Sequence, residues 1–540
     1  MRFFFWLYLF LGVCPALAQL TQVGRLELPV NSNTNETFNL LPLGERGALL
    51  TYHRIDDYSR QPHLFQFTRL DTALATRWTL DYKLPERFVP LQRFDNEQYV
   101  FHLYNELSTE KIAILRLNLD DGTTDFYEGL MPSSLDLSQF KVMGNVAYLS
   151  GYYRSRPVVM AFSFFDRSFR VFQGLYVNNM ELGSMEVDPF RQEVHVLTHS
   201  PRKRCQFTVR SYSPDGKPLR IIEYDGTQYS LITGKILPVS ADESLLVGNY
   251  SADCTPYSQG IYITRIHHAE TGKLSVTTDH GEAIRYFDFS KLKNFFNYLK
   301  PKRQQKLLAR VLKRREAGKD FKFRYRLLVH DLMPTPTGMR VMAEVYYPQY
   351  KGNMSPFMGA SARNTFLATQ GFGGPLLNVP NRATVDRYST GYQYTHAFIC
   401  EFDHDGNLLW DNCLPINDVT DTKLDQKVQM LPLSVPQDKH VVLAYSKEGE
   451  IATELIERDS VLRSGEVYKV LAAHSTEKIQ MTADDDVLAW FGPCLLASGY
   501  QKIVPERGSR TLPRDVFYLN KLRYNVYPLA PPPIEARKGD

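Results

Sequence analysis

A β-hairpin pattern recurs along this chain of 540 residues. Each copy has a strand of alternating apolar residues, a turn rich in Asp and Gly, and a returning strand, as in IAILRLNLDDGTTDFYEGL from Ile112. The Asp-Gly and Thr-Gly pairs provide the positive φ angles that tight hairpins require. The turns are marked by Asp71, Asp121, Asp166, Asp215, Thr271, Asp405 and Ser460. Successive markers lie 50, 45, 49, 56, 134 and 55 residues apart.

The hairpin interval matches one blade of a β-propeller. All intervals but one are close to the roughly 40–50 residues of a four-stranded blade. Two further strand-like runs precede each hairpin, such as FKVMG and VAYLSGYY before the third copy. Alternation in short runs bounded by turns is typical of strands. The long interval contains insertions at 288–319 and 351–390, and removing them restores the common spacing. The sequence therefore predicts an all-β protein, a β-propeller of four-stranded antiparallel blades.

The two ends of the chain predict how the ring closes. ASGYQKI, which follows Cys494, and DVFYLNKLRY from Asp515 are two strands of an incomplete last blade. The first mature segment, LTQVGRLELP, is the expected outer strand, with residues 21–29 pairing beside 515–524. Such closure removes exposed sheet edges, which otherwise promote aggregation. This count gives eight blades, and it becomes seven if the last repeat is misread.

The first 18 residues have the features of a secretory signal peptide. Arg2 is a positive n-region, residues 3–11 form a short apolar run, and Ala16-Leu17-Ala18 matches the small-x-small cleavage pattern. No later stretch is long and apolar enough for a bilayer span, which needs roughly 20 residues. The sequence thus predicts an exported protein that is periplasmic, outer-membrane-associated or extracellular, with no transmembrane span after signal removal.

The predicted domain organisation follows from these limits. The signal peptide occupies 1–18, the propeller 19–527, and a Pro-rich tail 528–540. The Gly/Ser/Asn-rich insertion at 351–390 predicts a flexible loop within the propeller.

The basic insertion at 288–319 is the strongest surface feature. Between residues 291 and 319 it holds eleven Lys and Arg against one acid, in a chain whose net charge is +4. Apolar residues recur at helical spacing and Pro301 interrupts them, which predicts a hairpin of two short helices. The candidate anion-binding patch consists of Lys302, Arg303, Lys306, Arg310, Lys313, Arg314 and Arg315.

Two interpretations of this patch remain open. It binds an anionic envelope lipid, lipopolysaccharide or an acidic glycan, or it is a solvated insertion that only covers a blade. No nucleic acid partner is expected, because no helix-turn-helix or stacking-platform pattern accompanies the charge.

The cysteines predict structural roles. Cys205 and Cys254 occupy comparable places in successive blades, whereas Cys400 and Cys413 flank the DHDGN turn. Both pairs are disulfide candidates, which requires Cα atoms within about 7 Å, and we favour Cys205–Cys254. With Cys494, five cysteines follow the signal peptide, so at least one has no partner within the chain. There is no CxxC and no zinc-type Cys/His spacing, so we predict no metal site.

Several segments resemble a family of exported Bacteroidetes β-propeller-like proteins with no assigned activity. They are FSKLKNFFNYLKPKRQQKLLARVLKRREAGKDFKFRYRLLVHDL, VMAEVYYPQY, GYQYTHAFICEFDHDGNLLWD, ASGYQKI and VFYLNKLRY. The earlier blades share only the general pattern. The resemblance implies an exported compartment and a repeat fold, and it brings no catalytic residues.

The sequence contains no established catalytic motif: HExxH, the P-loop, GxSxG and a strand-linked GxGxxG are all absent. The spacing in DHDGN is close to that of a calcium loop, but Gly406 falls where a ligand gap should be, so a hairpin turn is the better interpretation. We expect the triplet at 484–486 to be a solvated turn before a strand. His267-His268 and the His330-Asp331 pair could take part in metal or acid/base chemistry, although polar packing is the simpler explanation.

The preferred function is therefore an exported, envelope-associated binding or scaffold propeller of unknown ligand, without enzymatic activity and without a cofactor. This rests on analogy at the level of the fold. The alternative is a hydrolase or lyase that acts on a polysaccharide or peptide in the central funnel. It requires carboxylates, or a His/Asp set, that converge there from different blades.

Overall fold

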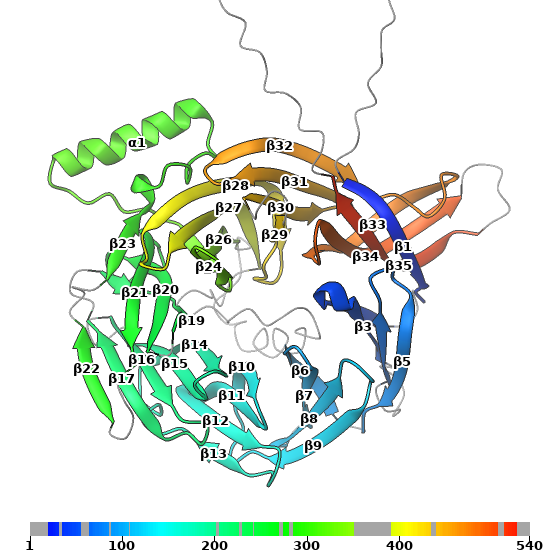
Figure 1. The fold of residues 1–540 in the computed structure, drawn as a ribbon, viewed down its shortest axis with the longest axis horizontal. Helices are drawn as coiled ribbons and strands as arrows, with labels where there is room; N and C mark the ends of the chain where they lie inside the picture. Colours follow the sequence, from blue (N-terminus) through cyan, green and yellow to red (C-terminus); the bar gives the residue numbers. More distant parts are fainter. Residues whose placement is uncertain are drawn as a thin grey trace, which may run out of the picture.

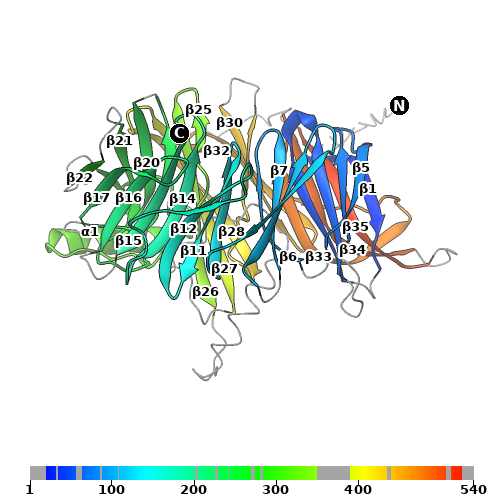
Figure 2. The same ribbon diagram turned by 90° about the horizontal axis from the view of Figure 1, so that it is seen from below.

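The computed structural model is a ring of blades around a central axis (Figure 1), and seen from the side the strands run along that axis (Figure 2). The signal peptide predicted over 1–18 and the tail predicted over 528–540 lie outside the described residues, as does the predicted 351–390 loop up to residue 389. The structure describes residues 20–31, 35–55, 64–85, 88–106, 109–200, 205–225, 229–240, 242–268, 274–279, 284–349, 390–433, 439–505 and 512–525.

The first half of the ring contains four antiparallel sheets, numbered in chain order. Blade 1 is β2 (Asn35–Pro42), β3 (Ala48–Ile55), β4 (Leu64–Leu70) and β5 (Thr76–Lys83). Blade 2 is β6 (Phe88–Asp95), β7 (Tyr99–Glu106), β8 (Lys111–Asn118) and β9 (Thr124–Leu130). Blade 3 is β10 (Asp136–Met143), β11 (Val146–Tyr153), β12 (Arg156–Ser163) and β13 (Phe169–Val171). Blade 4 is β14 (Glu181–Asp188), β15 (Glu193–Ser200), β16 (Gln206–Tyr212) and β17 (Pro218–Tyr224), with β22 (Ser275–Asp279) added in parallel at its edge.

The second half completes the ring and carries the α-helix. Blade 5 is β18 (Ser230–Leu231), β19 (Lys235–Pro238), β20 (Glu243–Ser251), β21 (Gly260–His267) and β23 (Arg285–Asp288). Blade 6 is β24 (Arg326–Val329), β25 (Met333–Thr335), β26 (Gly338–Gln349), β27 (Gly391–Asp403) and β28 (Leu408–Asp421). Blade 7 is β29 (Gln429–Leu433), β30 (His440–Lys447), β31 (Glu450–Glu457) and β32 (Ser460–Lys469). Blade 8 is β33 (Glu477–Ala489), β34 (Cys494–Pro505), β35 (Arg514–Tyr524) and β1 (Leu20–Pro29). The helices are η1 (Gly44–Arg46), η2 (Phe289–Lys291) and α1 (Pro301–Glu316).

Burial along the strands follows from face-to-face packing of neighbouring blades. The second strand of blade 4, β15, is buried along its whole length, because blades cover both of its faces. The outermost strand of blade 1, β5, instead alternates between exposed and half-buried residues. The apolar core is accordingly divided among the blade interfaces, as where Leu49 of blade 1 and Leu115 of blade 2 lie in one cluster.

The predicted ring closure and the prediction of eight blades are confirmed. In the described part of the chain the strands form eight sheets. The N-terminal strand β1 pairs antiparallel with the C-terminal strand β35, in a register that runs from Leu20 opposite Tyr524 to Pro29 opposite Val516. The first described strand, β1, is thus the outer strand of the last blade.

The basic insertion differs from the predicted helical hairpin. Only its second half is an α-helix, α1, whereas residues 292–300 form turns. The carboxylate of Asp411 in β28 accepts hydrogen bonds from the backbone N–H groups of Lys293 and Asn294, at 2.9 and 2.7 Å. These N–H groups are therefore held by a distant strand, so the prediction of a first helix, made from local spacing, was wrong.

The repeat is also modified between blades 4 and 5. The turn at Thr271 lies outside the described residues. The strand after it was expected to pair with the strand before it, β21, in the same blade. Instead, β23 pairs antiparallel with β21. The segment after the turn, β22, adds to β17 of the preceding blade.

Candidate functional site

The basic insertion is anchored on the outside of the ring, beside blades 5 and 6 (Figure 1). Val311 of α1 is 1% exposed, and Leu307 and Leu308 pack against the same core cluster. This cluster contains Phe295 and Phe323 and continues into the strands of both blades. The apolar side of α1 therefore holds the helix on the propeller and leaves the other side to solvent.

The seven cations of the predicted patch all lie on α1 and are exposed. Arg315 pairs with Asp288 at 2.9 Å, so it is less available than the sequence suggested. The other six have no ion-pair partner among the residues that the structure describes. We call them the cationic face: Lys302, Arg303, Lys306, Arg310, Lys313 and Arg314.

The cationic face opposes the stability of its own helix. Lys302, Lys306, Arg310 and Arg314 follow one another at four-residue intervals, a row of about 18 Å at 1.5 Å per residue. Like charges at this spacing destabilise a helix by about 0.2–0.5 kcal/mol per pair. The first turn of α1 contains no acid and the N-cap makes no side-chain hydrogen bond, so Lys302 and Arg303 stand where the helix dipole disfavours cations, whereas Lys313 and Arg314 stand in the last turn, where it favours them. The stability of the helix therefore does not explain why so many cations lie on one side of α1.

A series of ion pairs joins the innermost strands of successive blades around the axis, where Figure 1 shows β10, β14, β19 and β24. Lys141 of β10 lies 4.0 Å from Glu186 of β14. Lys235 of β19 lies 3.6 Å from the same Glu186 and 2.5 Å from Asp331, which follows β24. The Lys235 side chain is 9% exposed and that of Asp331 is 74% exposed. The series thus runs from the blade interfaces to solvent.

A second polar group continues this series in blade 6. Glu344 is fully buried in β26 and accepts hydrogen bonds from the backbone N–H groups of Lys427 and Val428, both at 2.8 Å. His330, beside Asp331, lies 2.9 Å from the Glu344 carboxylate. Glu344 therefore holds the start of blade 7 in place, and the same carboxylate is in contact with the His330 ring.

The carboxyl groups around Lys427 differ in pKa. Desolvation raises the pKa of Asp486 to about 6, although this side chain is exposed to solvent. Desolvation also acts on Asp421, but its ion pair with Lys427 outweighs this effect, and the pKa of Asp421 is lowered. Asp486 thus titrates closer to neutrality than Asp421, and both carboxyl groups interact with Lys427.

The position of Asp486 corrects a prediction. The triplet at 484–486 lies inside β33, not in a turn before a strand. A bulge between Ala483 and Asp486 accommodates the positive φ of 47° at Asp484, so the strand continues through the triplet. The sequence analysis assigned no binding or catalytic role to Asp486 or to the axial lysines. The available signal was a charged residue within a short apolar run, as Lys141 is in FKVMG.

The other predicted histidines have structural contacts. His267 Nδ1 lies 3.0 Å from the carboxylate of Glu243. His268 contacts Ser244 Oγ at 2.8 Å and Arg220 Nη1 at 2.9 Å. Desolvation, with a contribution from Arg220, lowers the pKa of His268 to about 3, so this ring is neutral at physiological pH.

The calcium-like spacing in DHDGN belongs to a hairpin turn between β27 and β28. The carboxylate of Asp403 accepts hydrogen bonds from the backbone N–H groups of Asp405 and Asn407, at 2.9 and 2.8 Å. Its oxygens are thus used to close the turn, which agrees with the hairpin interpretation.

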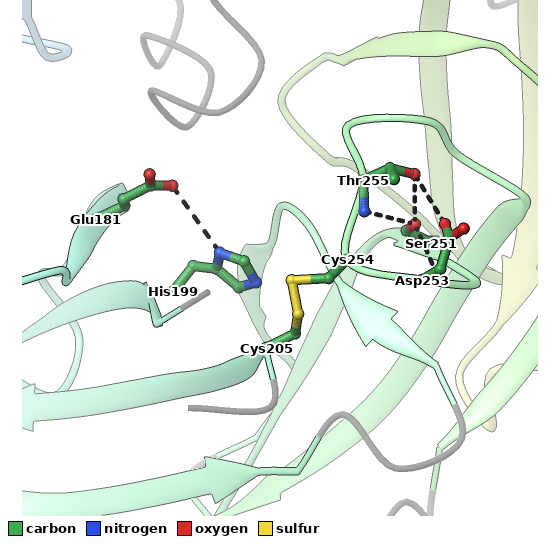
Figure 3. The surroundings of a disulfide bond; sticks show 7 residues. All are labelled: Glu181, His199, Cys205, Ser251, Asp253, Cys254 and Thr255. Atoms are coloured by element: carbon green, nitrogen blue, oxygen red, sulfur yellow. Dashed lines mark hydrogen bonds and ion pairs between the residues drawn. A yellow bond between two sulfur atoms is a disulfide. The ribbon is translucent and has the colours of Figure 1, made fainter. Parts of the chain in front are cut away.

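A disulfide joins Cys205 and Cys254, the pairing that the sequence favoured, with Cα atoms 5.7 Å apart. Cys205 directly precedes β16, and Cys254 lies between β20 and β21, so the bond links blades 4 and 5 (Figure 3). Residues of two successive blades are thereby connected covalently.

The alternative disulfide candidate, Cys400–Cys413, was wrong: both residues are buried and free. The register of β27 with β28 gives the reason. Cys400 lies opposite Asp411, whereas Cys413 lies opposite Phe398, so the two cysteines are not partners across the ladder.

Comparisons with known proteins identify no family. No protein-family model matches the chain, and no curated protein matches it. Among solved structures, it is similar to the quinohemoprotein alcohol dehydrogenase ADHIIG from Pseudomonas putida HK5, with 10% identity, TM-score 0.40, and coverage of 97% of this chain and 78% of that one. It is also similar to the β-propeller domain of the Trilobed protease from Pyrococcus furiosus, with 9% identity, TM-score 0.33, and coverage of 78% and 97%. A third is the polysaccharide lyase Uly1, with 10% identity, TM-score 0.37, and coverage of 82% and 92%. At such values the likeness concerns the fold alone.

None of the helices within the described ranges is long and apolar enough to cross a membrane.

Proposed function

We propose that this protein is an exported, envelope-associated binding propeller that attaches to anionic lipid headgroups through the cationic face of α1. The observation that carries the proposal is the row of exposed cations without ion-pair partners in the described residues, held on the propeller by the buried side of the same helix. Because their mutual repulsion costs stability, a surface of opposite charge would relieve it.

The surroundings of the row support a lipid surface over a soluble acidic glycan. Leu312 of α1 is 59% exposed, and a lipid surface, unlike a soluble glycan, can cover an exposed apolar side chain. The helix that carries the row, α1, lies on the outer rim of the ring, away from the central axis (Figure 1). The signal-peptide features of residues 1–18 and the resemblance to exported Bacteroidetes proteins support placement in a bacterial envelope.

Neutralising the row should weaken this binding. A variant with Lys302, Lys306, Arg310 and Arg314 changed to Gln is expected to bind vesicles that contain phosphatidylglycerol at least tenfold less tightly. Each cation near an anionic surface contributes about 1 kcal/mol. Wild-type binding should fall steeply between 0.1 and 1 M salt, as the Debye length shortens from about 10 to about 3 Å. Cosedimentation with vesicles measures both effects.

The matched control removes the same charge elsewhere. Lys83, Lys217, Lys478 and Lys502 are exposed and lie on other blades, so their change to Gln should leave vesicle binding within a factor of two or three. Equal losses in both variants would mean that net charge, not α1, determines binding. A wild type that binds heparin but no anionic vesicle, or neither, would contradict the lipid assignment.

A second candidate function is a hydrolase or lyase that acts on a polysaccharide or peptide. The specific observation in its favour is the pair of carboxyl groups beside Lys427, whose pKa values move apart. Release of reducing ends from a panel of polysaccharides tests it. Asp486→Asn should abolish the activity and leave vesicle binding unchanged. A wild type that cleaves none of the panel would remove this candidate.

The two carboxyl groups should affect stability in opposite directions with pH. The pKa of Asp486 is raised in the folded state, so its ionisation opposes folding above pH about 6, and this cost disappears as the pH falls toward 4. Asp486→Asn should therefore raise the melting temperature at pH 7.5 but not at pH 4. The pKa of Asp421 is lowered, so Asp421→Asn should lower the melting temperature at pH 7.5, with a smaller loss in acid. Calorimetry at both pH values checks the two signs.

A further inference from the structure

The disulfide between blades 4 and 5 has a histidine beside it (Figure 3). One ligand atom each of His199, Cys205 and Cys254 lie within 4.8 Å of one another. Figure 3 shows one ring nitrogen of His199 directed toward the sulfur atoms and the other, Nδ1, directed toward Glu181. The Nδ1 atom is 3.9 Å from Glu181 Oε2. The imidazole thus lies between a carboxylate and two sulfurs.

The position of His199 is fixed by strand register. His199 in β15 lies directly opposite Glu181 in β14. The His199 side chain is 8% exposed and that of Glu181 is 23% exposed. Among the residues that the structure describes, Glu181 Oε2 and His199 Nδ1 have no hydrogen-bond partner. A carboxylate behind a ligating imidazole fixes the ring orientation in many metal sites, and its loss typically weakens metal binding 10–100-fold.

The loop that carries Cys254 is held independently of the disulfide. Ser251 Oγ accepts hydrogen bonds from the backbone N–H groups of Asp253 and Thr255, at 3.3 and 3.2 Å (Figure 3). The Asp253 carboxylate also pairs with Lys322 at 2.6 Å. Behind this loop, Leu197 of blade 4 and Tyr250 of blade 5 share one buried cluster. The two cysteines should therefore remain close together when the bond between them is broken.

We infer that Cys205, Cys254 and His199 form a zinc(II) site when the disulfide is reduced, with Glu181 as a positioning residue. A dithiol reductant transfers two electrons and two protons to the disulfide, leaves two cysteine thiols and becomes a disulfide itself. Binding of Zn²⁺ then releases both thiol protons. Two thiolates and one neutral imidazole nitrogen are a ligand set that zinc accepts, with water in a fourth position. In the oxidised protein the sulfurs bind each other, so the metal site exists in the reduced state alone.

Metal titration of the full-length mature protein tests the inference. The disulfide is reduced with a phosphine, which adds no competing thiol, and cobalt(II) serves as a spectroscopic substitute for zinc. The reduced wild type should bind one equivalent of cobalt with the intense absorption of a tetrahedral thiolate complex, and zinc should displace it. The oxidised wild type should show no such absorption. Zinc should also raise the melting temperature of the reduced protein, because it binds the folded state.

Variants separate this site from adventitious thiol binding, since Cys400, Cys413 and Cys494 are free in the wild type. Cys254→Ser should abolish the cobalt absorption, and His199→Ala and Glu181→Gln should each weaken zinc binding at least tenfold. His267→Ala is the matched control and should have no effect. Absorption that survives Cys254→Ser or His199→Ala would overturn the inference. So would failure of the reduced wild type to bind, including a loss of its β-sheet circular dichroism on reduction, because the site requires packed blades.

Discussion

A protein that lacks residues 19–30 should melt far below the full-length chain or lose cooperative folding, because the deletion removes β1 and opens the ring. The lost ladder runs along β35 from Val516 to Tyr524. At about 0.5–1.5 kcal/mol of net stabilisation for each hydrogen bond, its loss amounts to several kcal/mol. Polar contacts add to this, since Arg25 of β1 donates to Gln501 at 2.8 Å and Glu27 pairs with Arg514 at 2.8 Å. Folded domains are stable by only about 5–15 kcal/mol in total.

Addition of the missing strand as a peptide distinguishes ring closure from general damage. A synthetic peptide with the sequence of residues 19–30 should pair with the exposed edge of β35 and restore part of the melting temperature. A peptide of the same composition in scrambled order should not. A deletion variant that melts like the full-length protein would contradict the closure.

The propeller could be predicted from the sequence because its signals are local. Each blade repeats one hairpin, and turns such as that at Gly122, with φ of 74°, depend on neighbouring residues only. Ring closure was also predictable, because the last blade lacked one strand and the first strand-like segment of the chain had no partner in the first blade. In each case alternation and turn chemistry within a few residues determine the element.

The predictions were wrong where the local structure depends on contacts with residues far away in the sequence. The first half of the basic insertion has helical spacing, but Asp411 of β28 accepts hydrogen bonds from the backbone N–H groups of Lys293 and Asn294, and residues 292–300 form turns. Cys400 and Cys413 flank one turn, and only the register of the two strands separates them. The raised pKa of Asp486 comes mainly from desolvation, and Lys427, which lies between β28 and β29, opposes it. Sequence spacing carries no information about such contacts, so the axial residues could not be identified in advance.

Phe295→Ala should lower the free energy of unfolding by about 3–5 kcal/mol, the usual cost of removing a buried Phe ring. Phe295 is fully buried between blades 5 and 6. Its ring stacks on Phe289 at 4.1 Å between centroids and meets Phe398 and His396 edge-on, both at 5.1 Å. This ring therefore joins the basic insertion to the strand β27. Urea titration followed by circular dichroism measures the loss.

Leu312→Ala is the matched control, because Leu312 lies on the same insertion but is 59% exposed. Its effect on stability should stay within about 0.5 kcal/mol, as for other surface substitutions. The two variants also separate anchoring from binding. Phe295→Ala keeps every cation of α1, so its folded fraction should still bind anionic vesicles if charge determines the affinity, whereas Leu312→Ala should bind them more weakly. A Phe295→Ala protein as stable as the wild type would show that the insertion is not part of the core. The packing of α1 against blades 5 and 6 would then be wrong.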